Sequence, residues 1–541
     1  MLACHRTPRA LRLPLVRLLL LALFLPGVGE AAGQAAQSPD TLDLVLRGGR
    51  ILDGLGNPWF RGDVGITGDR IVAVGDLSRV PARRAVELAE DHYVAPGFID
   101  THSHAGGGLG TPAGSMAEPL LAQGITTVFV NPDGGGPVDL VAQRRGYETR
   151  GIGVNVAQFV PHGSVRGEVL GMADRAPSAA EMDRMRSLVR RGMEEGAWGL
   201  SSGPFYAPGS FSDTDELVEL ARVVAEFGGA YQSHIRDESD YTVGLMAAVE
   251  EVVTVAAGAG IPGVVTHVKA LGPPVWGFSL AVIRRIEAAR AAGIELYADQ
   301  YPYIASATGL GAALLPRWAE AGGRDSLNAR LDDPATRARV REAVVENLAR
   351  RGGADRIQFR LFEPEPTIEG RTLADVAREQ GRDAPDAALQ LLRRGSPGIV
   401  SFNMDERDVQ LLMAQPWTMT ASDGDLPEWG AGVPHPRSYG SFPRKLRTYV
   451  VEQGVLSLEA AIRTMTGLPA SVYRMPDRGR ILPGMAADLV VFDLDEVRDP
   501  ATFTEPHQLS EGMVHVLVNG VPAVEGGSFS GERPGRVLRR P

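Results

Sequence analysis

The sequence predicts an α/β fold: a TIM (β/α)8 barrel with a small β-sandwich domain built from both chain ends. Segments with strand-type alternation and Gly-rich turns occur near both ends of the chain. Between them, eight short apolar runs alternate with helical stretches, which is typical of a parallel barrel. The length of 541 residues, 44% hydrophobic and 22% charged, allows one large barrel with additions.

Residues 1–32 have the pattern of a cleaved signal peptide. The apolar stretch LLLLALFLPGV is followed by the small residues GEAAGQAA and is preceded or opened by four arginines: Arg6, Arg9, Arg12 and Arg17. A transmembrane anchor is the alternative, but the apolar run is shorter than the roughly 20 residues that span a bilayer. We therefore expect cleavage near Ala32 and an exported protein, periplasmic or secreted, without a stable membrane anchor.

The predicted β-sandwich combines residues 40–93 with residues 481–541. Residues 42–75 alternate apolar and polar side chains between Gly-rich turns, as antiparallel hairpins do. A similar pattern returns near the other end, in ADLVVFD (487–493) and HVLVNGVPAV (515–524). Because these segments flank a long α/β region, we expect them to pair with one another.

The predicted barrel covers residues 94–480. Its strand candidates are VAPGFID (94–100), TTVFVNP (126–132), GVNVAQFVP (153–161), GAWGLSS (196–202), GAYQSH (229–234), GVVTHV (263–268), IELYAD (294–299) and WTMTASD (417–423). Helices are expected between them, for example over 180–196 and 279–293. The last two strands are far apart in the sequence, and helical segments with further short strands fill the gap. We therefore expect an insertion around 310–400.

Composition excludes several classes of site and partner. Cys4 is the only cysteine and lies in the leader, so the mature chain has neither disulfides nor thiolate metal ligands. The net charge is −11, and the leader contributes +3, so the mature chain is near −14. An acidic chain without basic runs is a poor partner for nucleic acid or an anionic membrane. We expect a small-molecule substrate.

Five residues that can bind a metal ion fall at the carboxyl ends of predicted strands, where barrels carry their catalytic groups. They are His102 and His104 after the first strand, His234 after the fifth, His267 after the sixth and Asp423 after the eighth. Residues i and i+2 of an extended segment point the same way, so the first two histidines can bind one ion. Each signal alone also fits a structural histidine. The coincidence of five predicts a metal site.

With this set of ligands the chain resembles the amidohydrolase superfamily, whose pattern is H-x-H after strand one, His after strands five and six and Asp after strand eight. Within it, the chain is similar to the D-aminoacylase (N-acyl-D-amino-acid deacylase) family. The segments that carry this likeness are LRGGRILDGLGNP, APGFIDTHSH, GAWGLSSGPFYAPGSF, SHIRDE, YPYIASATGL, HPRSYGSFPR and PHQLSEGMVHVLVNG. The resemblance covers nearly the whole mature chain. It implies an enzyme that hydrolyses the amide bond of N-acyl-D-amino acids.

One position departs from the family pattern. The usual GVTTVVVGNCG provides a cysteine metal ligand after strand two, whereas this chain reads GITTVFVNPDGGG and has Asp133 in that place. A carboxylate oxygen binds Zn²⁺ at about 2.0–2.2 Å, so a site can persist, though a harder and less zinc-selective one. The alternative is that Asp133 only caps the Gly-rich loop. We expect it to bind metal.

The resemblance also implies a division of the ligands and a mechanism. Asp133, His234 and His267 would hold a tightly bound Zn²⁺, and His102, His104 and Asp423 a second, weaker ion, with other divalent metals also compatible. A bound metal lowers the pKa of water towards neutrality and polarises the scissile carbonyl. Asp423 would accept the proton of that water and deliver it to the leaving nitrogen. A carboxylate that binds a metal tightly is not free to accept a proton. We therefore expect Asp423 to act mainly as the base and to contact the metal only weakly.

The sequence signals for residues that contact the substrate are weaker than those for the metal ligands. A substrate carboxylate favours bidentate arginine, and Arg236, Arg437 and Arg317 lie in suitable segments. Tyrosine hydroxyls could add donors, from Tyr206, Tyr301 and Tyr303, and His162 follows the third strand. For each arginine and tyrosine, a structural ion pair or a packed aromatic ring is an equal alternative, and His162 would either orient the acyl group or brace a loop.

Three other functions fit parts of the pattern. A dipeptidase for dipeptides with a C-terminal D-residue would use the same site, and the sequence does not separate it from a deacylase. A cyclic-amide hydrolase of the same superfamily usually needs a carbamylated lysine on strand four, where this chain has GAWGLSS, and Lys269 is not expected to replace it. A non-catalytic metal-holding barrel has no need of a proton acceptor such as Asp423.

Overall fold

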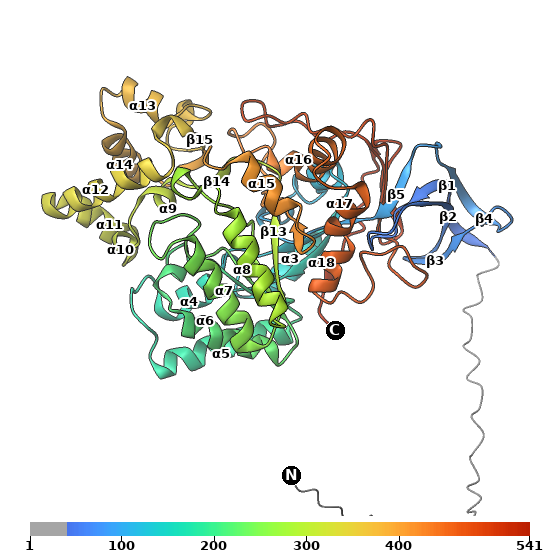
Figure 1. Ribbon diagram of the computed structural model, residues 1–541, viewed down its shortest axis with the longest axis horizontal. Helices are drawn as coiled ribbons and strands as arrows, with labels where there is room; N and C mark the ends of the chain where they lie inside the picture. The colour runs from blue at the N-terminus through green and yellow to red at the C-terminus, as the bar shows by residue number, and fades with distance from the viewer. Residues whose placement is uncertain (1–40) are drawn as a thin grey trace, which may run out of the picture. The chain divides into compact units, whose positions relative to one another are not determined.

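The computed structural model describes residues 41–541 (Figure 1). The predicted signal peptide lies outside these residues. Within the described range, no helix combines the length and the apolar character that a membrane crossing needs.

Both ends of the described chain contribute to one nine-stranded sheet. Its strand order is β21-β20-β19-β18-β5-β1-β2-β3, and β4 pairs with β1. The strands are β1 (Leu42–Ile51), β2 (Phe60–Thr67), β3 (Arg70–Gly75), β4 (Ala82–Glu87), β5 (Tyr93–Pro96), β18 (Leu489–Phe492), β19 (Met513–Val518), β20 (Val521–Glu525) and β21 (Ser528–Phe529). The two halves join where β18 runs antiparallel to β5. Apolar side chains of both halves, such as Leu44, Val64 and Leu489, share one buried cluster.

Parallel strands build the central TIM-barrel-like region. They form a sheet of order β22-β8-β7-β6 and a sheet of order β17-β13-β12-β11-β10-β9. Their bounds are β6 (Phe98–Asp100), β7 (Ile125–Val130), β8 (Asn155–Gln158), β9 (Val160–Pro161), β10 (Gly199–Ser202), β11 (Ala230–Ser233), β12 (Gly263–Val265), β13 (Leu296–Gln300), β17 (Thr418–Thr420) and β22 (Val537–Leu538). Each of the eight predicted barrel segments contains one or two of these strands.

Two of the predicted strands are interrupted. The third is divided at Phe159, with β8 pairing with β7 and β9 pairing with β10. The first is divided at Gly97, so that β5 belongs to the nine-stranded sheet and β6 to the barrel. A Cβ at Gly97 would overlap the side chain of buried Thr126, which explains why the crossing point has no side chain.

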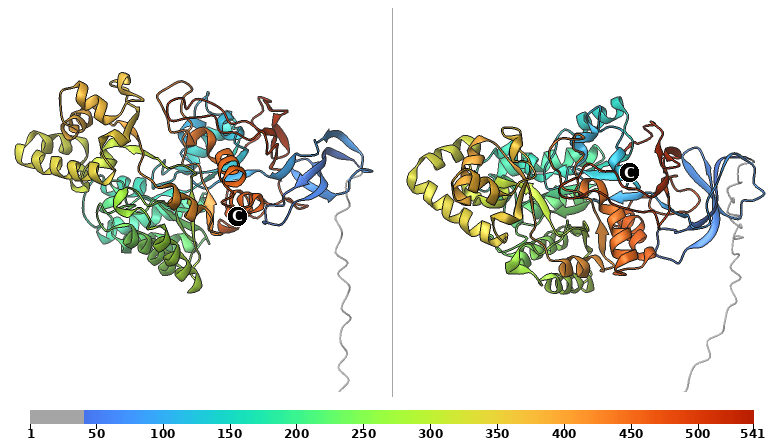
Figure 2. Two further views of the ribbon diagram at one scale, coloured as in Figure 1. Left: turned by 45° about the horizontal axis from the view of Figure 1, so that its top comes forward. Right: turned by 90° about the horizontal axis from the view of Figure 1, so that it is seen from above.

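Helices cover the parallel strands. Helices α5 to α8 pack against one another in sequence order, and their colours run from teal to yellow-green (Figures 1 and 2). Outside the insertion, the helices are α1 (Gly106–Leu109), α2 (Glu118–Leu121), α3 (Leu140–Arg150), α4 (His162–Leu170), α5 (Ala179–Glu194), α6 (Thr214–Ala225), α7 (Leu245–Ala259), α8 (Ser279–Ala291), α15 (Glu406–Met413), α16 (Arg437–Arg444), α17 (Leu458–Met465) and α18 (Gly467–Val472). The π-helix η5 (Lys445–Glu452) and the 3-10 helices η1 (Gly209–Phe211) and η2 (Pro273–Val275) complete this set.

A compact insertion separates β13 from α15. It contains an antiparallel sheet of order β14-β16-β15, with β14 (Ser306–Gly309), β15 (Ile357–Leu361) and β16 (Gly398–Ser401). Its helices are α9 (Leu310–Leu314), α10 (Arg317–Glu320), α11 (Gly323–Asp332), α12 (Pro334–Arg350), η3 (Ala354–Arg356), η4 (Pro366–Ile368), α13 (Leu373–Glu379) and α14 (Ala384–Arg394). The apolar faces of these elements form a hydrophobic cluster of their own. The insertion therefore has its own core and supplies side chains to the site from its edge.

Candidate metal centre and active site

Six side chains from five strand ends converge at one place. His102 and His104 follow β6, Asp133 follows β7, His234 follows β11, His267 follows β12 and Asp423 follows β17. They form two overlapping groups whose ligand atoms lie within 4.8 Å of one another, the first with His102, His104, Asp133 and Asp423, the second with Asp133, His234 and His267. Asp133 belongs to both groups. The predicted residues therefore meet, and they do so around a shared carboxylate.

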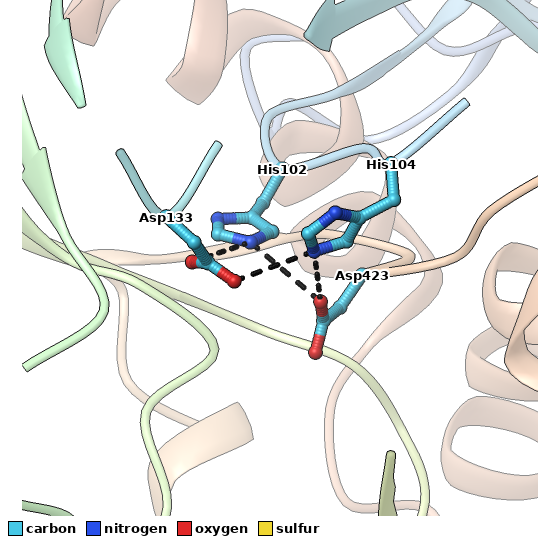
Figure 3. Close-up of side chains that lie close together, drawn as sticks. All are labelled: His102, His104, Asp133 and Asp423. Carbon is cyan, nitrogen blue, oxygen red and sulfur yellow. Dashed lines mark ion pairs between the residues drawn. The ribbon is translucent and has the colours of Figure 1, made fainter. Parts of the chain in front are cut away.

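The first group presents its nitrogen and oxygen atoms to a common centre (Figure 3). His102 Nε2 lies 3.2 Å from Asp133 Oδ1 and 3.6 Å from Asp423 Oδ1. His104 Nε2 lies 3.4 Å from Asp133 Oδ2 and 3.2 Å from Asp423 Oδ1. Two ligands at about 2.0–2.1 Å from a tetrahedral Zn²⁺ are about 3.3 Å apart. These separations match donors that surround one ion.

The second group has similar spacing. Asp133 Oδ1 lies 3.6 Å from His234 Nδ1 and 3.4 Å from His267 Nε2. His102 Nδ1 and Nε2, Asp133 Oδ1 and both ring nitrogens of His234 are buried and have no hydrogen-bond partner among the described residues. Buried polar atoms without partners are costly unless a ligand satisfies them. The donors therefore fit a divalent cation in chemistry and in spacing.

The backbone is strained at three of these residues. Asp133, His267 and Asp423 have φ values of 56°, 36° and 49°, in the left-handed region that residues with a Cβ seldom adopt. Such conformations cost about 1–3 kcal/mol each and concentrate at functional sites, where the surrounding structure enforces them. All three residues belong to the ligand cluster, so the strained conformations coincide with the proposed metal site.

Hydrogen bonds hold the loop of Asp133 in place. Ser201 on β10 donates through Oγ to the carbonyl of Asn131 at 2.5 Å, and Gly134 N donates back to Ser201 Oγ at 3.2 Å. A Cβ at Gly134 would lie 2.9 Å from Gly163 N, so this close approach requires glycine. Asp133 Oδ1 makes no hydrogen bond to the loop itself. A role limited to capping the Gly-rich loop is therefore not supported.

Two buried carboxylates beneath the cluster connect the first loop with the last strands. Asp100 accepts hydrogen bonds from Ser422 N at 2.8 Å and Ser422 Oγ at 2.5 Å, and Asp299 accepts from His267 N at 2.6 Å. Burial raises the pKa of Asp100 to about 6, although the hydrogen bonds from Ser422 oppose this rise. The sequence analysis did not single out these residues, since only the assembled barrel shows which loops they hold.

Asp423 is an ionised carboxylate with one oxygen directed at the cluster. Its Oδ2 pairs with Arg437 Nη1 at 2.6 Å, which leaves Oδ1 directed at His102 and His104. Burial opposes ionisation, but the charges of Arg437 and His267 and the hydrogen bond from His104 outweigh it. The pKa of Asp423 therefore lies well below its usual range. The carboxylate stays ionised at neutral pH.

A second network supports His267. Lys269 Nζ lies 2.5 Å from Glu238 Oε1 and 2.7 Å from His267 Nδ1, and Glu238 Oε1 lies 3.1 Å from the same ring nitrogen. Ring nitrogens that face away from a metal are commonly held in this way. Glu238 was quoted within the segment SHIRDE but not recognised as a support for His267, because the contact spans two strand ends.

The cluster lies at the wall of a cavity of about 820 Å³. Of the residues predicted to contact substrate, Tyr206, Tyr301 and Arg437 line it. The insertion contributes Thr308, whose hydroxyl lies 3.3 Å from Tyr206 Oη, and other residues of its edge.

Four of the candidate substrate residues do not line this cavity. Arg236 is engaged by Glu251 through Nη2 at 2.7 Å and Nε at 3.1 Å, and buried His162 pairs through Nε2 with Glu216 Oε1 at 2.8 Å. The predicted contact with substrate is therefore not supported for either residue. A sequence pattern shows the residue type but not which carboxylate neutralises it. Arg317 and Tyr303 also lie outside the lining.

Comparisons with known proteins agree with this geometry. A profile described as the amidohydrolase family matches residues 88–524. N-acyl-D-glutamate deacylase from Alcaligenes xylosoxydans xylosoxydans is 38% identical over 523 residues, which are 93% of this chain and 97% of that protein.

Solved structures show the same relationship. N-acyl-D-glutamate deacylase from Bordetella bronchiseptica, in complex with zinc and a phosphonate inhibitor that mimics the tetrahedral intermediate, is 36% identical with a TM-score of 0.79. A D-aminoacylase studied for its binuclear metal centre is 34% identical, also with a TM-score of 0.79. Both comparisons cover 92% of this chain and 100% of the other.

The fold and the site thus define a metal-dependent hydrolase class, in which the ligands come from the carboxyl ends of barrel strands. This chain belongs to the amidohydrolase family and, within it, to the D-aminoacylase (N-acyl-D-amino-acid deacylase) group.

Proposed function

We propose that this enzyme hydrolyses N-acyl-D-amino acids to a carboxylate and a free D-amino acid. The observation that carries the proposal is the sharing of Asp133 between two ligand groups beside an ionised Asp423 at the cavity wall. Relatives over the whole described length are deacylases of N-acyl-D-glutamate and D-aminoacylases, which supports the same reaction. A cyclic-amide substrate has no comparable support.

Zn²⁺ is the metal we propose, because a solved relative contains it and the donors are imidazoles and carboxylates. Asp133, His234 and His267 would hold the tighter ion, and His102, His104 and Asp423 a second, weaker one. When bound, the metal lowers the pKa of water and polarises the scissile carbonyl.

The chain's own residues would move the proton. Asp423 Oδ1 faces the ligand cluster and accepts the proton of the attacking water, while Arg437 keeps Oδ2 in place at 2.6 Å. The same oxygen then delivers the proton to the leaving nitrogen. Arg437 has further N–H groups that can bind the α-carboxylate next to that nitrogen. Tyr206 and Tyr301 line the same cavity as Arg437.

A hydrolysis screen tests this proposal. Purified zinc-loaded enzyme is assayed with N-acetyl-D-amino acids, their L-enantiomers and L-Xaa-D-Xaa dipeptides, beside chelator-treated enzyme and the Asp423→Asn variant. We expect turnover of the N-acetyl-D-substrates that the chelator abolishes and that Asp423→Asn lowers by roughly 10²–10⁴-fold. Faster turnover of the dipeptides would replace the deacylase assignment with a dipeptidase. Absence of turnover on every amide would refute the proposal.

Three finer features belong to the same proposal. We infer that the nine-stranded sheet folds over as a small β-sandwich around its shared cluster, and that β17 and β6 close the eight-stranded barrel. Support for closure comes from two backbone hydrogen bonds, Asp423 N to His102 O and His104 N to Gly424 O, both 2.9 Å long. We also propose that the protein is exported and that residues 1–32 are removed. Mass spectrometry of the protein recovered outside the cytoplasm tests this, because the expected mass is that of a chain without these residues.

A further inference from the structure

One stretch of the catalytic cavity's wall has no charged side chain. In the described chain, this uncharged wall is formed by residues of 163–172 and 207–209, namely Gly163, Ser164, Gly167, Gly171, Met172, Ala207, Pro208 and Gly209. Ser164 is the only polar side chain in this set. The charged residues that line the same cavity belong to other segments, such as the ligand cluster and its neighbours. The uncharged wall is therefore suited to contact with an apolar group.

A second cavity, of about 320 Å³, adjoins the uncharged wall. Met172 and Gly309 line both cavities. Met172 O accepts a hydrogen bond from Gly322 N at 2.9 Å, so the segment after α4 and the insertion form this common wall together. Buried leucines of the insertion line the second cavity: Leu310, Leu315, Leu327 and Leu392. An apolar space therefore lies next to the catalytic cavity.

The charged side chains of the second cavity already have partners in the protein. Within residues 41–541 they are Glu320 and Arg324. Glu320 Oε2 pairs with Arg317 Nη1 at 3.1 Å. Arg324 donates through Nη1 to Leu392 O at 3.2 Å and through Nη2 to Ser396 Oγ at 2.8 Å. The second cavity therefore favours an aliphatic group over an anion.

Two glycines in these walls are required neither by backbone conformation nor by close packing. Gly167 lies inside α4, where glycine destabilises a helix relative to alanine, and a Cβ there would meet only Pro208 Cγ at an ordinary 3.8 Å. Gly309 has φ −83° and ψ 144°, which any residue adopts, and a Cβ there would meet nothing within 4 Å. Both glycines leave space, one along the uncharged wall and the other where the two cavities adjoin.

The acyl half of the substrate is the part that points to the uncharged wall. In the sheet of order β17-β13-β12-β11-β10-β9, Asp423 and Arg437 follow β17 at one edge, whereas α4 follows β9 at the other edge. The leaving nitrogen must lie near Asp423, its proposed proton donor, so the amino-acid half lies towards the β17 edge. The acyl half is on the other side of the scissile carbonyl. It therefore extends towards α4.

The space in this direction is larger than an acetyl group needs. The catalytic cavity alone has a volume of about 820 Å³. Pockets of about 300–1,000 Å³ hold whole drug-sized ligands. Met172 stands between the two cavities, and a methionine side chain, with its three rotatable bonds, adapts readily to a neighbouring chain. Burial of aliphatic surface against these walls is favourable in proportion to its area.

We propose that the uncharged wall and the second cavity bind a long aliphatic acyl chain, so that the preferred substrates are fatty-acyl rather than acetyl derivatives of D-amino acids. This inference rests on the proposed deacylase function and specifies the acyl group of its substrate. The chain passes Gly167 and enters the insertion between Met172 and Gly309. The insertion thereby determines acyl-chain specificity.

A series of acyl-chain lengths tests the inference. Zinc-loaded enzyme is assayed with the acetyl, butanoyl, hexanoyl, octanoyl and decanoyl derivatives of D-glutamate and of D-leucine, each below its critical micelle concentration. We expect kcat/KM to rise with chain length by up to about fourfold for each buried CH₂ group, and by about tenfold or more from acetyl to hexanoyl. The rise should appear with whichever D-amino acid is turned over.

Gly309→Leu places a side chain where the two cavities adjoin. It should lower the ratio of kcat/KM for the decanoyl and acetyl substrates by about tenfold or more, because the distal CH₂ groups lose their burial. Gly146→Leu is the matched control. Gly146 also has nothing within 4 Å of an added Cβ, but it lies in α3 and lines neither of these cavities, so the ratio should survive.

Inhibition of the unmodified enzyme provides a second measurement if Gly309→Leu does not fold. Acetate, hexanoate and decanoate are compared as inhibitors, because the free carboxylate is the acyl product of the reaction. We expect inhibition to strengthen with chain length. Equal inhibition by the three carboxylates would contradict the proposed acyl site.

The outcomes distinguish this inference from the deacylase function. A kcat/KM that stays constant or falls as the chain lengthens would overturn the acyl site and leave the deacylase intact. The same holds if Gly309→Leu keeps the full rise, or if Gly146→Leu loses as much of it as Gly309→Leu does. Absence of turnover at every chain length would instead count against the deacylase function itself.

Discussion

Asp133 has two oxygen atoms where a cysteine has one sulfur, and the site uses both. Oδ1 faces His102, His234 and His267, whereas Oδ2 faces His104. Oδ1 therefore faces members of both ligand groups, and Oδ2 offers the first group a second oxygen. Hard oxygen donors also discriminate less sharply in favour of zinc than a thiolate does.

Replacing Asp133 tests its proposed role as a ligand. We expect Asp133→Ala to lose most of the bound metal, because both ligand groups lose their shared member. Asp133→Cys should retain metal and should favour Zn²⁺ over Mn²⁺ more strongly than the unmodified enzyme. Metal analysis after dialysis against both ions measures the ratio. Unchanged metal content in Asp133→Ala would show that Asp133 is not a ligand.

Arg437→Met should change the pH dependence of the reaction as well as its rate. The charge of Arg437 helps to keep the pKa of Asp423 well below its usual range despite burial. Without that charge the pKa rises, the base is lost at a higher pH, and the acid limb of the kcat/KM profile moves to higher pH. Arg444→Met, which removes a partner of Asp499 instead, should leave the limb in place. An unshifted limb in Arg437→Met would argue against Asp423 as the base.

Metal binding should release protons at neutral pH. Burial lowers the pKa of His104, but hydrogen bonds to Asp133 and Asp423 and their charges raise it to about 10. Burial and Lys269 likewise lower the pKa of His267, while Asp423 and hydrogen bonds to Asp133 and Glu238 raise it to about 9. Both rings hold a proton at pH 7 when no metal is bound, and a metal displaces it.

We expect the release of about two protons for each fully metal-loaded site. The apparent affinity for metal should therefore rise with pH until the pH exceeds the pKa values of His104 and His267. Calorimetry in two buffers of different ionisation enthalpy at pH 7 counts the protons. His104→Asn should release one fewer. Metal binding with no proton release would contradict this assignment.

At the scale of elements, a short loop places His102 and His104 at the catalytic end of the barrel. The loop after β6 is fixed on both sides, by Ser103 N donating to Phe129 O at 3.0 Å and by His104 N donating to Gly424 O at 2.9 Å. The strand before it can leave the nine-stranded sheet and enter the barrel only because Gly97 has no side chain.

Gly97→Ala should destabilise the protein by about 1–3 kcal/mol, because the added methyl overlaps Thr126 in a packed interior. Gly146→Ala is the matched control: it lies in α3 with nothing within 4 Å of the added Cβ, and it should stabilise by about 0.4–1 kcal/mol. Denaturant unfolding of the zinc-loaded proteins measures both changes. Equal stability of the two variants would refute the packing argument.

At the scale of the whole molecule, the end of the chain returns to the barrel. Strand β22 runs parallel to β8, and Leu538 O accepts from Trp198 Nε1 at 2.9 Å. Arg536 pairs with Asp69 at 2.6 Å, and Arg540 N donates to Gly196 O at 3.0 Å. The last residues therefore fasten the barrel strands and the nine-stranded sheet to the same segment.

Deletion of residues 535–541 should lower the free energy of unfolding by a few kcal/mol, at about 1 kcal/mol for each lost hydrogen bond. The melting temperature should fall, while the metal content changes little because the deleted residues do not contact the ligands. Arg539→Ala, which alters an exposed side chain of the same segment, should leave the melting temperature unchanged. A truncated protein as stable as the full chain would contradict this role.

The sequence by itself determined the strand and helix pattern, because alternation of apolar residues follows directly from burial on the two faces of a sheet or the one face of a helix. It also determined which histidines and aspartates follow strands, and so which of them meet at one end of a barrel. The spacing of His102 and His104 and the position of Asp423 required no tertiary information.

Only the tertiary structure decided which charges are already neutralised. Arg236 and Arg351 are alike as residue types, yet Glu251 occupies the first and no carboxylate of the described chain reaches the second. Ion pairs join residues from different elements, and whether a guanidinium is free to bind substrate depends on neighbours that are distant in the sequence. The roles of Asp100 and Glu238 and the break at Gly97 could not be predicted from the sequence pattern either, because they too depend on contacts between residues that are distant in the sequence.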